Sequence, residues 1–356
     1  MKTPAKKLPI SLDEHRLDGE TVSAGCISCP LLAECGGYTR RGGGWSCMDR
    51  CVTCDPARCD LVCLTKHRDF ARALLEVGGF GGNNLSEMSA TPRDIALPHY
   101  VPAIQHRTDD LHLNWVALPL RAFMRFRDGT YEPIADSAIS LRAKLGLASH
   151  ARLVLLGTGK DRPIETYWRF RRRDSVPEKL AALGFECAIA PNYSLFLDDP
   201  RTHHMFNRKR SLICAEEFSR AGVPSIPYLQ TVAHADWTFW RDFLKAHAEI
   251  AIVAKEFQTG LAHPERGKAA IAKLQKLQDE VGRDLHVVAI GGARYRMQLR
   301  AAFASWTVID SVPFMKAVKR RAVVDIGKRV KWAPALGEVV GHLAMHNVAS
   351  YSRWIA

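Results

Sequence analysis

The chain has 356 residues, of which 47% are hydrophobic and 24% are charged, and these proportions are ordinary for a globular protein. No apolar run approaches the ~20 residues that a membrane-spanning helix needs, so we expect no membrane partner. The formal net charge of +13 predicts a polyanionic partner, and nucleic acid is the first candidate.

Eight of the ten cysteines lie close together near the start of the chain. They are Cys26, Cys29, Cys35, Cys47, Cys51, Cys54, Cys59 and Cys63. Thiolates at such short spacings can converge on a soft metal centre. The N-terminal residues are basic and lack the apolar core of a secretory signal, which predicts a cytoplasmic protein with reduced thiols. We therefore predict a metal-binding module and not a set of disulfides.

The spacing of these cysteines fits two kinds of metal centre. The first three resemble part of an auxiliary iron–sulfur site, and the last four resemble a loosened ferredoxin run. Eight thiolates also suit two zinc sites of four cysteines each. An iron–sulfur cluster is favoured, with zinc as the alternative, because the run lacks the paired CxxC symmetry of zinc ribbons.

Within the same run, Cys47-x3-Cys51-x2-Cys54 matches the radical-SAM triplet. Two features argue against that reading. Thr53 stands where that family usually has an aromatic residue, and no strand precedes the triplet. The triplet is weak support for a radical enzyme because it is a lone motif out of its usual context.

From residue 100 onward, short apolar segments alternate with segments of helical periodicity. The predicted strands are Tyr100–Gln105, Trp115–Leu120, Arg152–Gly157, Cys187–Tyr193, Pro224–Gln230, Ile250–Glu256, His286–Gly292 and Trp306–Asp310. The predicted helices include Glu178–Leu183, Ser211–Ala221, Phe239–Ala248 and Ala269–Val281. Continuously apolar strands are typical of a parallel sheet that is buried on both faces.

This alternation predicts an α/β protein, and in particular a (β/α)8 TIM-type barrel with an N-terminal cysteine-rich module. A doubly wound open sheet is the alternative. No Gly-x-Gly-x-x-Gly follows the first strand, which argues against a dinucleotide site. We expect residues 1–95 to form the metal-binding module and a connector. Residues 96–356 should form the barrel and C-terminal helices.

Polar residues follow six of the predicted strands. They include Gly157-Thr158-Gly159-Lys160-Asp161, Asn192, Gln230, Lys255-Glu256, Gly291-Gly292 and Asp310. Any one of them could simply cap the next helix. In a barrel, however, the carboxyl ends of the strands hold the active site, so six such ends favour a pocket.

Two groups of basic residues are candidates for phosphate contacts. The first group interleaves with Trp168 and Phe170 and contains Arg169, Arg171, Arg172 and Arg173. The second contains Lys316, Lys319, Arg320 and Arg321, followed by Lys328, Arg329 and Lys331. Alternatively, these basic residues form a solvated surface that binds no nucleic acid.

Four stretches from about residue 150 onward have an informative order and spacing. They are Ile226–Thr231, His286–Gly292, Trp306–Met315 and His342–Tyr351. Together they resemble the tRNA-guanine transglycosylase superfamily. The resemblance implies a barrel in which Gln230 reads the substrate base and Asp310, at a strand end, is the nucleophile.

The chain also departs from the pattern of that family. The acid expected at an early strand end is absent from Gly157-Thr158-Gly159, or is supplied by Asp161, and Asn192 stands near the place of a base-reading aspartate. Glu256-Phe257-Gln258 replaces a glycine pair. The C-terminal cysteines that join a terminal histidine on zinc are absent, so we interpret His346 as a core residue. These departures resemble most the DNA-modifying branch, which inserts 7-deazaguanine bases.

The resemblance implies a glycosyltransferase that exchanges guanine in nucleic acid, DNA favoured over tRNA, for a 7-deazaguanine base. Such chemistry needs a carboxylate to attack the anomeric carbon, and Asp310 would supply it. The target base must first leave its stack. The residues expected to contact the base are Gln230, Asn192, Asp161, Gly291 and Gly292. Asp310 could also be a helix N-cap, and Gln230 a buried amide.

Two other functional classes remain open from the sequence. One is an iron–sulfur redox or radical enzyme that uses the cysteine module. The other is a non-catalytic nucleic-acid-binding protein that kept the fold and lost the catalytic acids.

Overall fold

The computed structural model describes residues 75–82, 85, 95–105, 109–195, 201–232 and 234–356. These residues form two compact units. The first takes in the described parts of Met1–Asn84, together with Ser194–Lys209 and Gln230–Asp242. The second takes in the described parts of Leu85–Tyr193, Arg210–Leu229 and Phe243–Ala356. The predicted division into residues 1–95 and 96–356 stays a prediction.

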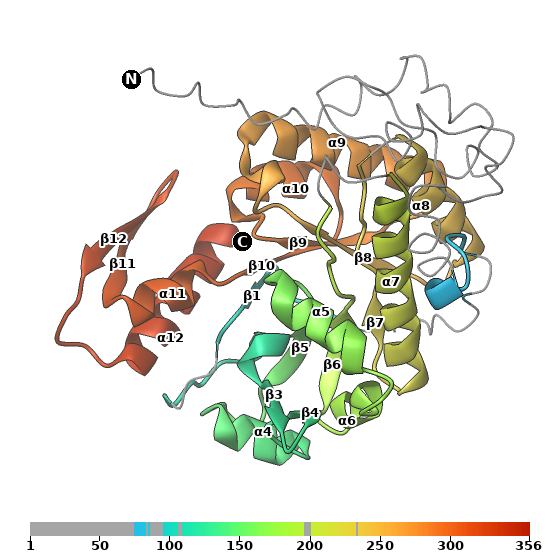
Figure 1. Cartoon of the computed structure of the whole chain (residues 1–356). Helices are drawn as coiled ribbons and strands as arrows, with labels where there is room; N and C mark the ends of the chain where they lie inside the picture. The colour runs from blue at the N-terminus through green and yellow to red at the C-terminus, as the bar shows by residue number, and fades with distance from the viewer. Residues whose placement is uncertain (1–74, 83–84, 86–94, 106–108, 196–200, 233) are drawn as a thin grey trace, which may run out of the picture. The chain divides into compact units, whose positions relative to one another are not determined.

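The second unit is an α/β structure built on parallel sheets (Figure 1). One four-stranded sheet has the order β1-β10-β9-β8, and the other has the order β2-β5-β6-β7. The first contains β1 (Tyr100–Pro102), β10 (Trp306–Asp310), β9 (His286–Ile290) and β8 (Ile252–Glu256). The second contains β2 (Trp115–Pro119), β5 (Arg152–Leu156), β6 (Phe185–Ile189) and β7 (Ser225–Ile226). All eight predicted strands are therefore confirmed.

Several strands are shorter than predicted, and proline explains the largest difference. Strand β7 contains only Ser225–Ile226, although we predicted a strand over Pro224–Gln230. Pro224 and Pro227 flank it and have no N–H group to donate to a neighbouring strand. Strand β1 likewise ends at Pro102.

Two isolated parallel bridges connect the edges of the two sheets. Ala103, just after β1, pairs with Ala117 of β2, and the N–H of Ile104 donates to the Ala117 carbonyl at 3.1 Å. Tyr228, just after β7, pairs with Ala254 of β8, and the N–H of Leu229 donates to the Ala254 carbonyl at 2.8 Å. Both edges of one sheet are therefore joined to the edges of the other.

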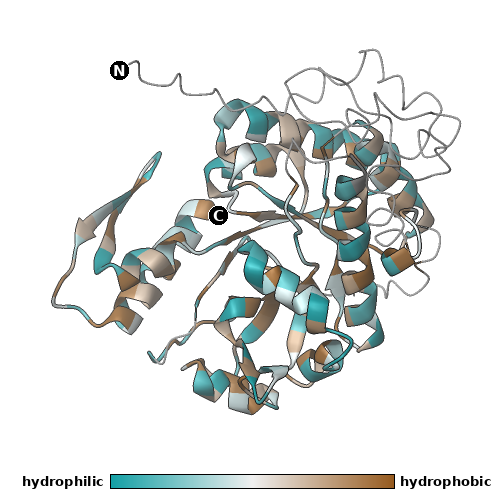
Figure 2. Ribbon diagram, viewed as in Figure 1, coloured by the Kyte–Doolittle hydropathy of each residue, from teal (hydrophilic) through white to brown (hydrophobic). Residues whose placement is uncertain are grey.

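Helices follow most of the strands. They are α5 (Asp161–Phe170), α6 (Val176–Ala181), α7 (Arg201–Arg220), α8 (His234–Ala246), α9 (Pro264–Val281), α10 (Arg296–Ala302), α11 (Val312–Val318) and α12 (Val340–Ile355). All four predicted helical segments overlap these helices. Helix α9 shows the expected sequence logic, because Pro264 begins it and Gly282 ends it with a φ of 78°. Helices α5 and α9 carry hydrophobic residues on one side and hydrophilic residues on the other, which suits one buried face and one face in solvent (Figure 2).

The structure adds two antiparallel hairpins and a short helix that the sequence analysis did not predict. Strands β3 (Met124–Arg127) and β4 (Thr130–Pro133) form one hairpin, and helix α4 (Ala138–Lys144) follows it. Strands β11 (Arg321–Ile326) and β12 (Val330–Pro334) form the other. The first was detectable, because Asp128-Gly129 adopts positive φ values of 50° and 78°, and Asp-Gly is a typical two-residue hairpin turn.

Candidate functional site

Asp310 is the last residue of β10, and both of its carboxylate oxygens accept hydrogen bonds. Oδ1 accepts the backbone N–H of Val312 at 2.8 Å, and Oδ2 accepts the hydroxyl of Tyr351 at 3.2 Å. The residue is 6% exposed, and this burial raises the pKa of its carboxyl group, while its hydrogen bonds oppose the rise. Asp310 thus accepts the N–H of the first residue of α11, although the N-cap of that helix is Ser311, and it also presents a carboxylate at a strand end.

The C-terminal stretch His342–Tyr351 contacts the end of β10 at Asp310. Tyr351 lies on α12 and its ring packs edge-on against Tyr100 of β1, with ring centroids 5.2 Å apart. The Tyr100 hydroxyl donates to the backbone carbonyl of Asp310 at 3.1 Å. Burial, and next the charge of Asp310, raise the pKa of both tyrosines, so both remain neutral hydrogen-bond donors at neutral pH. Neither tyrosine was predicted from the sequence to contact Asp310.

Glu256 ends β8 and forms a second polar centre in the same unit. Its Oε2 atom accepts a hydrogen bond from Nδ2 of Asn192 at 2.5 Å, and its backbone N–H donates to the Tyr228 hydroxyl at 3.2 Å. Asn192 follows β6, so the side-chain bond joins the two sheets. Burial raises the pKa of the half-buried Glu256 carboxyl, while hydrogen bonds and the Lys255 charge oppose the rise.

Strand register places Glu256 and Asp310 at the carboxyl-terminal ends of two strands of one parallel sheet. Glu256 pairs with Ile290 of β9, and Ile290 pairs with Ile309 of β10, which precedes Asp310. Neighbouring strands lie about 4.8 Å apart, so two strands separated by a third lie about 10 Å apart. Successive side chains of a strand point to opposite faces, so Glu256 lies on the face of Ile309 and Asp310 lies on the other face of the sheet.

The glycines at the strand ends allow close packing. Gly291 has a φ of 71°, and a Cβ atom there would lie 2.2 Å from Cγ of Gln258. A Cβ atom on Gly157 would lie 2.3 Å from the backbone carbonyl oxygen of Ile189. A Cβ atom on Gly292 would lie 2.7 Å from the Cβ atom of Ala289. Gly291 and Gly292 are therefore needed for close packing at this strand end. Their contact with the base stays a prediction.

Two other predicted base-contacting residues, Gln230 and Asp161, belong to different units. Gln230 belongs to the first unit, where it is 3% exposed and its backbone carbonyl accepts the indole N–H of Trp240 at 3.0 Å. Asp161 belongs to the second unit and is the exposed first residue of α5. A carboxylate in the first turn stabilises a helix through its dipole, which supplies a structural reason for Asp161.

The arginines of the first basic group contact side chains of the protein itself, which was not predicted. Arg171 is 5% exposed, its Nε donates to Glu217 at 2.7 Å, and its guanidinium lies 3.3 Å from the Trp168 ring centroid. This placement corrects the predicted phosphate role of Arg171, because a buried and paired guanidinium cannot reach a nucleic acid. Arg172 is exposed and shares Glu217, and Arg173 is exposed and pairs with Asp174. Arg169 is also exposed and lies over the Phe170 ring.

The second basic group is spread over α11 and the β11–β12 hairpin. Lys319, Arg321, Lys328 and Arg329 are exposed. Lys331 is also exposed and pairs with Asp325 at 2.8 Å. Lys316 lies over the Trp332 ring at 5.6 Å, and Arg320 donates to the Glu338 carbonyl.

Helix α12 anchors the β11–β12 hairpin through the His-Asn pair of the terminal motif. The buried Asn347 amide accepts the N–H of Val323 at 2.8 Å and donates to the Arg321 carbonyl at 2.9 Å. A ring nitrogen of His346 lies 2.9 Å from the Val323 carbonyl. His346 is solvent-exposed, so the prediction that it is a core residue was wrong.

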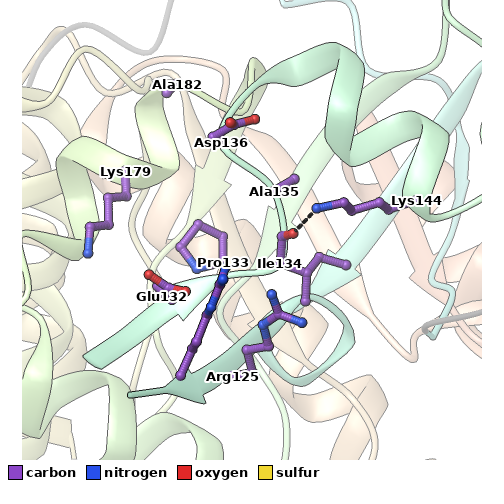
Figure 3. A pocket seen from close by; sticks show the side chains of 10 residues that line it. Arg125, Glu132, Pro133, Ile134, Ala135, Asp136, Lys144, Lys179 and Ala182 are labelled. Carbon is purple, nitrogen blue, oxygen red and sulfur yellow. Dashed lines mark hydrogen bonds between the residues drawn. The ribbon is translucent and has the colours of Figure 1, made fainter. Parts of the chain in front are cut away.

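A pocket of about 310 Å³ lies beside the β3–β4 hairpin (Figure 3). It is lined by Arg125, Arg127, Glu132, Pro133, Ile134, Ala135, Asp136, Lys144, Lys179 and Ala182. Lys144 is held in its wall by a hydrogen bond to the Ile134 carbonyl at 2.5 Å. None of the predicted site residues lines this pocket, so it is separate from the strand-end residues.

The eight clustered cysteines all lie outside the residues that the structure describes. The other two, Cys187 and Cys214, are buried and free, and burial raises the pKa of each thiol to about 12. Such thiols are unreactive core residues. Across the described segments, no group of three or more His, Cys, Asp or Glu side chains is placed to hold a metal ion. In the same segments, every helix is too short or too polar to span a bilayer.

Comparisons with protein-family models, with curated proteins and with solved structures each found no match to this chain.

Proposed function

We propose that this protein exchanges guanine in nucleic acid for a 7-deazaguanine base, and that Asp310 is the nucleophile. One observation carries the proposal: the Tyr351 hydroxyl donates to the Asp310 carboxylate across 41 residues of sequence. These two residues come from two of the four stretches on which the transglycosylase resemblance rests. Contact between them supports reading the stretches as parts of one site.

We also propose that the two sheets close into a (β/α)8 barrel. The support is the pair of parallel bridges, Ala103 with Ala117 and Tyr228 with Ala254, which join the sheets at both edges. Eight parallel strands linked in this order would make a closed ring. In a barrel, the carboxyl ends of the strands carry the chemistry, and Asp310, Glu256 and Asn192 all stand at or just after such ends.

The proposed reaction has two steps. In the first, a carboxylate oxygen of Asp310 attacks the anomeric carbon and the guanine departs, so that a covalent sugar–aspartate bond replaces the glycosidic bond. In the second, the incoming base attacks the same carbon and releases Asp310. Tyr351 holds the carboxylate in position through its hydrogen bond. Gln230 belongs to the first unit, and its role in reading the purine edge stays a prediction from the sequence, since an amide can both donate to that edge and accept from it.

DNA is the favoured substrate, because the departures from the family pattern resemble the DNA-modifying branch and the chain is strongly basic. The direct test is mass spectrometry of nucleosides from the DNA and tRNA of cells with and without this protein. We expect a 7-deazaguanine nucleoside in the DNA that disappears with the protein. If the nucleosides of both nucleic acids are identical in the two kinds of cell, the proposed activity is contradicted.

The exposed hairpin cations should contact phosphates. Replacing Arg321, Lys328 and Arg329 with Ala should weaken duplex DNA binding and flatten the plot of log K against log salt. Each lost phosphate contact changes that slope by about 0.9, so the three together should change it by up to about 2.7.

The matched control replaces Lys245, Lys268 and Lys276, three exposed lysines on α8 and α9, with Ala. It removes the same charge and should leave the slope near that of the parent protein. Equal slopes for both triple variants would mean that the hairpin acts only through net charge.

We propose that the cysteine module binds metal, since eight thiolates are the donor set that zinc and iron–sulfur centres use. Elemental analysis should find about two zinc ions per chain, or iron in multiples of about four with matching sulfide. The iron outcome would favour the redox or radical enzyme as a second activity. Purified protein with neither metal, and with a melting temperature that chelators do not change, would refute the module.

A further inference from the structure

We propose that the pocket beside the β3–β4 hairpin binds the phosphate monoester group of an organic ligand. The pocket has a volume of about 310 Å³, which lies within the range of roughly 300–1,000 Å³ that is typical of small-molecule sites. It is separate from the strand-end residues, so the proposal goes beyond base exchange and does not depend on it.

The lining of the pocket carries an excess of positive charge. Four of its side chains are cationic and two are carboxylates, which gives a net charge of +2. The cations are Arg125, Arg127, Lys144 and Lys179, and the carboxylates are Glu132 and Asp136. A phosphate monoester carries a charge of about −1.5 to −2 near neutral pH, so it would nearly neutralise this excess.

Two of the cations come from different elements and lack an acidic partner. Arg125 lies on β3 and Lys179 on α6, and neither forms an ion pair within the described segments (Figure 3). Glu132 of β4 stands opposite Arg125 in the strand register, but in the same segments these two side chains form no ion pair. A guanidinium can donate two hydrogen bonds to a phosphate, and an ammonium adds a point charge.

Aromatic residues hold the hairpin from its other face. Phe126, between the two pocket arginines, packs edge-on against Phe170 with ring centroids 5.0 Å apart, and its centroid lies 5.2 Å from that of Tyr131. Successive side chains of a strand point to opposite faces, so Arg125 and Arg127 share the face turned away from these rings. A strand anchored in this way presents both arginines in advance, which lowers the entropic cost of binding.

The remaining wall of the pocket suits an organic group beside the phosphate. Pro133, Ile134, Ala135 and Ala182 supply nonpolar surface. Lys144 is fixed in this wall, because its Nζ atom donates to the Ile134 carbonyl at 2.5 Å (Figure 3). A free nucleoside monophosphate and the 5′-phosphate end of a DNA strand both combine an organic group with a phosphate monoester.

Isothermal titration calorimetry of the full chain with thymidine 5′-monophosphate tests the proposal. Thymidine lacks the purine that the base-exchange site would take. We expect the parent protein to bind one nucleotide per chain and not to bind thymidine, which has no phosphate. Arg125→Gln should weaken the binding about tenfold to hundredfold, because it removes hydrogen bonds between charged groups. Glu132→Gln should tighten it about twofold to fivefold, because it removes a negative charge from the pocket.

The controls Arg300→Gln and Glu265→Gln change the net charge equally at exposed positions on α10 and α9, and both should bind the nucleotide as the parent does. Arg125 is also exposed, so its replacement should leave the fold intact.

Short thymidine oligonucleotides with a 5′-phosphate or a 5′-hydroxyl distinguish the two sources of the phosphate. A preference for the 5′-phosphate strand that Arg125→Gln abolishes identifies a DNA end as the ligand. Tighter binding of the free nucleotide identifies a small molecule. Parent affinity in Arg125→Gln, or a parent protein that binds neither the nucleotide nor the 5′-phosphate in preference to the unphosphorylated forms, would overturn the proposal and would leave base exchange untouched.

Discussion

Asp310→Asn should abolish base exchange while leaving the fold intact. Asn can still accept hydrogen bonds from the Val312 N–H and the Tyr351 hydroxyl, which the aspartate accepts at 2.8 Å and 3.2 Å. It lacks the charged oxygen that would attack the sugar. Loss of a catalytic nucleophile typically reduces the rate by about 10⁴- to 10⁶-fold, so we expect a reduction of that order in steady-state exchange.

The measurement is the rate at which labelled guanine enters DNA, with circular dichroism as the check on folding. Tyr351→Phe is the matched comparison, because it removes only the hydroxyl that holds Asp310. It should slow exchange far less than Asp310→Asn does. An Asp310→Asn variant that exchanges bases at the parent rate would show that Asp310 only supports the structure, through its hydrogen bond to the Val312 N–H.

Asp236→Asn should lower the stability of the protein strongly. Asp236 and Arg208 are 4% and 2% exposed in their side chains and lie 2.7 Å apart. The other oxygen of Asp236 accepts the Val232 N–H at 2.8 Å. Removal of one partner from a buried ion pair typically costs about 3–5 kcal/mol in the free energy of unfolding.

Urea denaturation of the purified protein would measure this loss. Glu265→Gln is the control, since its pair with Lys268 is exposed and such pairs contribute about 0–1 kcal/mol. If the two variants lowered the free energy of unfolding equally, the Arg208–Asp236 pair would not be the buried anchor that the structure describes.

The strands of this fold could be predicted because their sequences are simple. Strands buried on both faces of a parallel sheet are apolar along their whole length, so Val287–Ile290 and Leu153–Leu156 stand out from their neighbours. The ends of the strands were less predictable, because pairing stops where proline lacks an N–H, as at Pro227. The β3–β4 hairpin carried a usable signal in Asp128-Gly129, whereas the bulged β11–β12 hairpin reads in sequence only as a basic segment.

The sequence shows candidate site residues that directly follow a strand. It does not show the contacts of those residues with distant parts of the chain. Asp310 followed from its place after an apolar strand. Its partner Tyr351 comes from a helix 41 residues later, and no local pattern announces that contact. Glu256 was seen at a strand end, but its bond to Asn192 depends on how the two sheets meet. Charge alone misled at Arg171, because a buried pair with Glu217 looks in sequence like a surface cation.

Incorporation of a labelled base by the purified protein tests the central claim most directly. Isotopically labelled 7-deazaguanine would be incubated with the full chain and either duplex DNA or tRNA, and mass spectrometry would follow both the nucleic acid and the released guanine. We expect incorporation into DNA with one guanine released for each labelled base inserted, and no incorporation with Asp310→Asn. Absence of the label from both nucleic acids, or release of guanine without insertion, would contradict it.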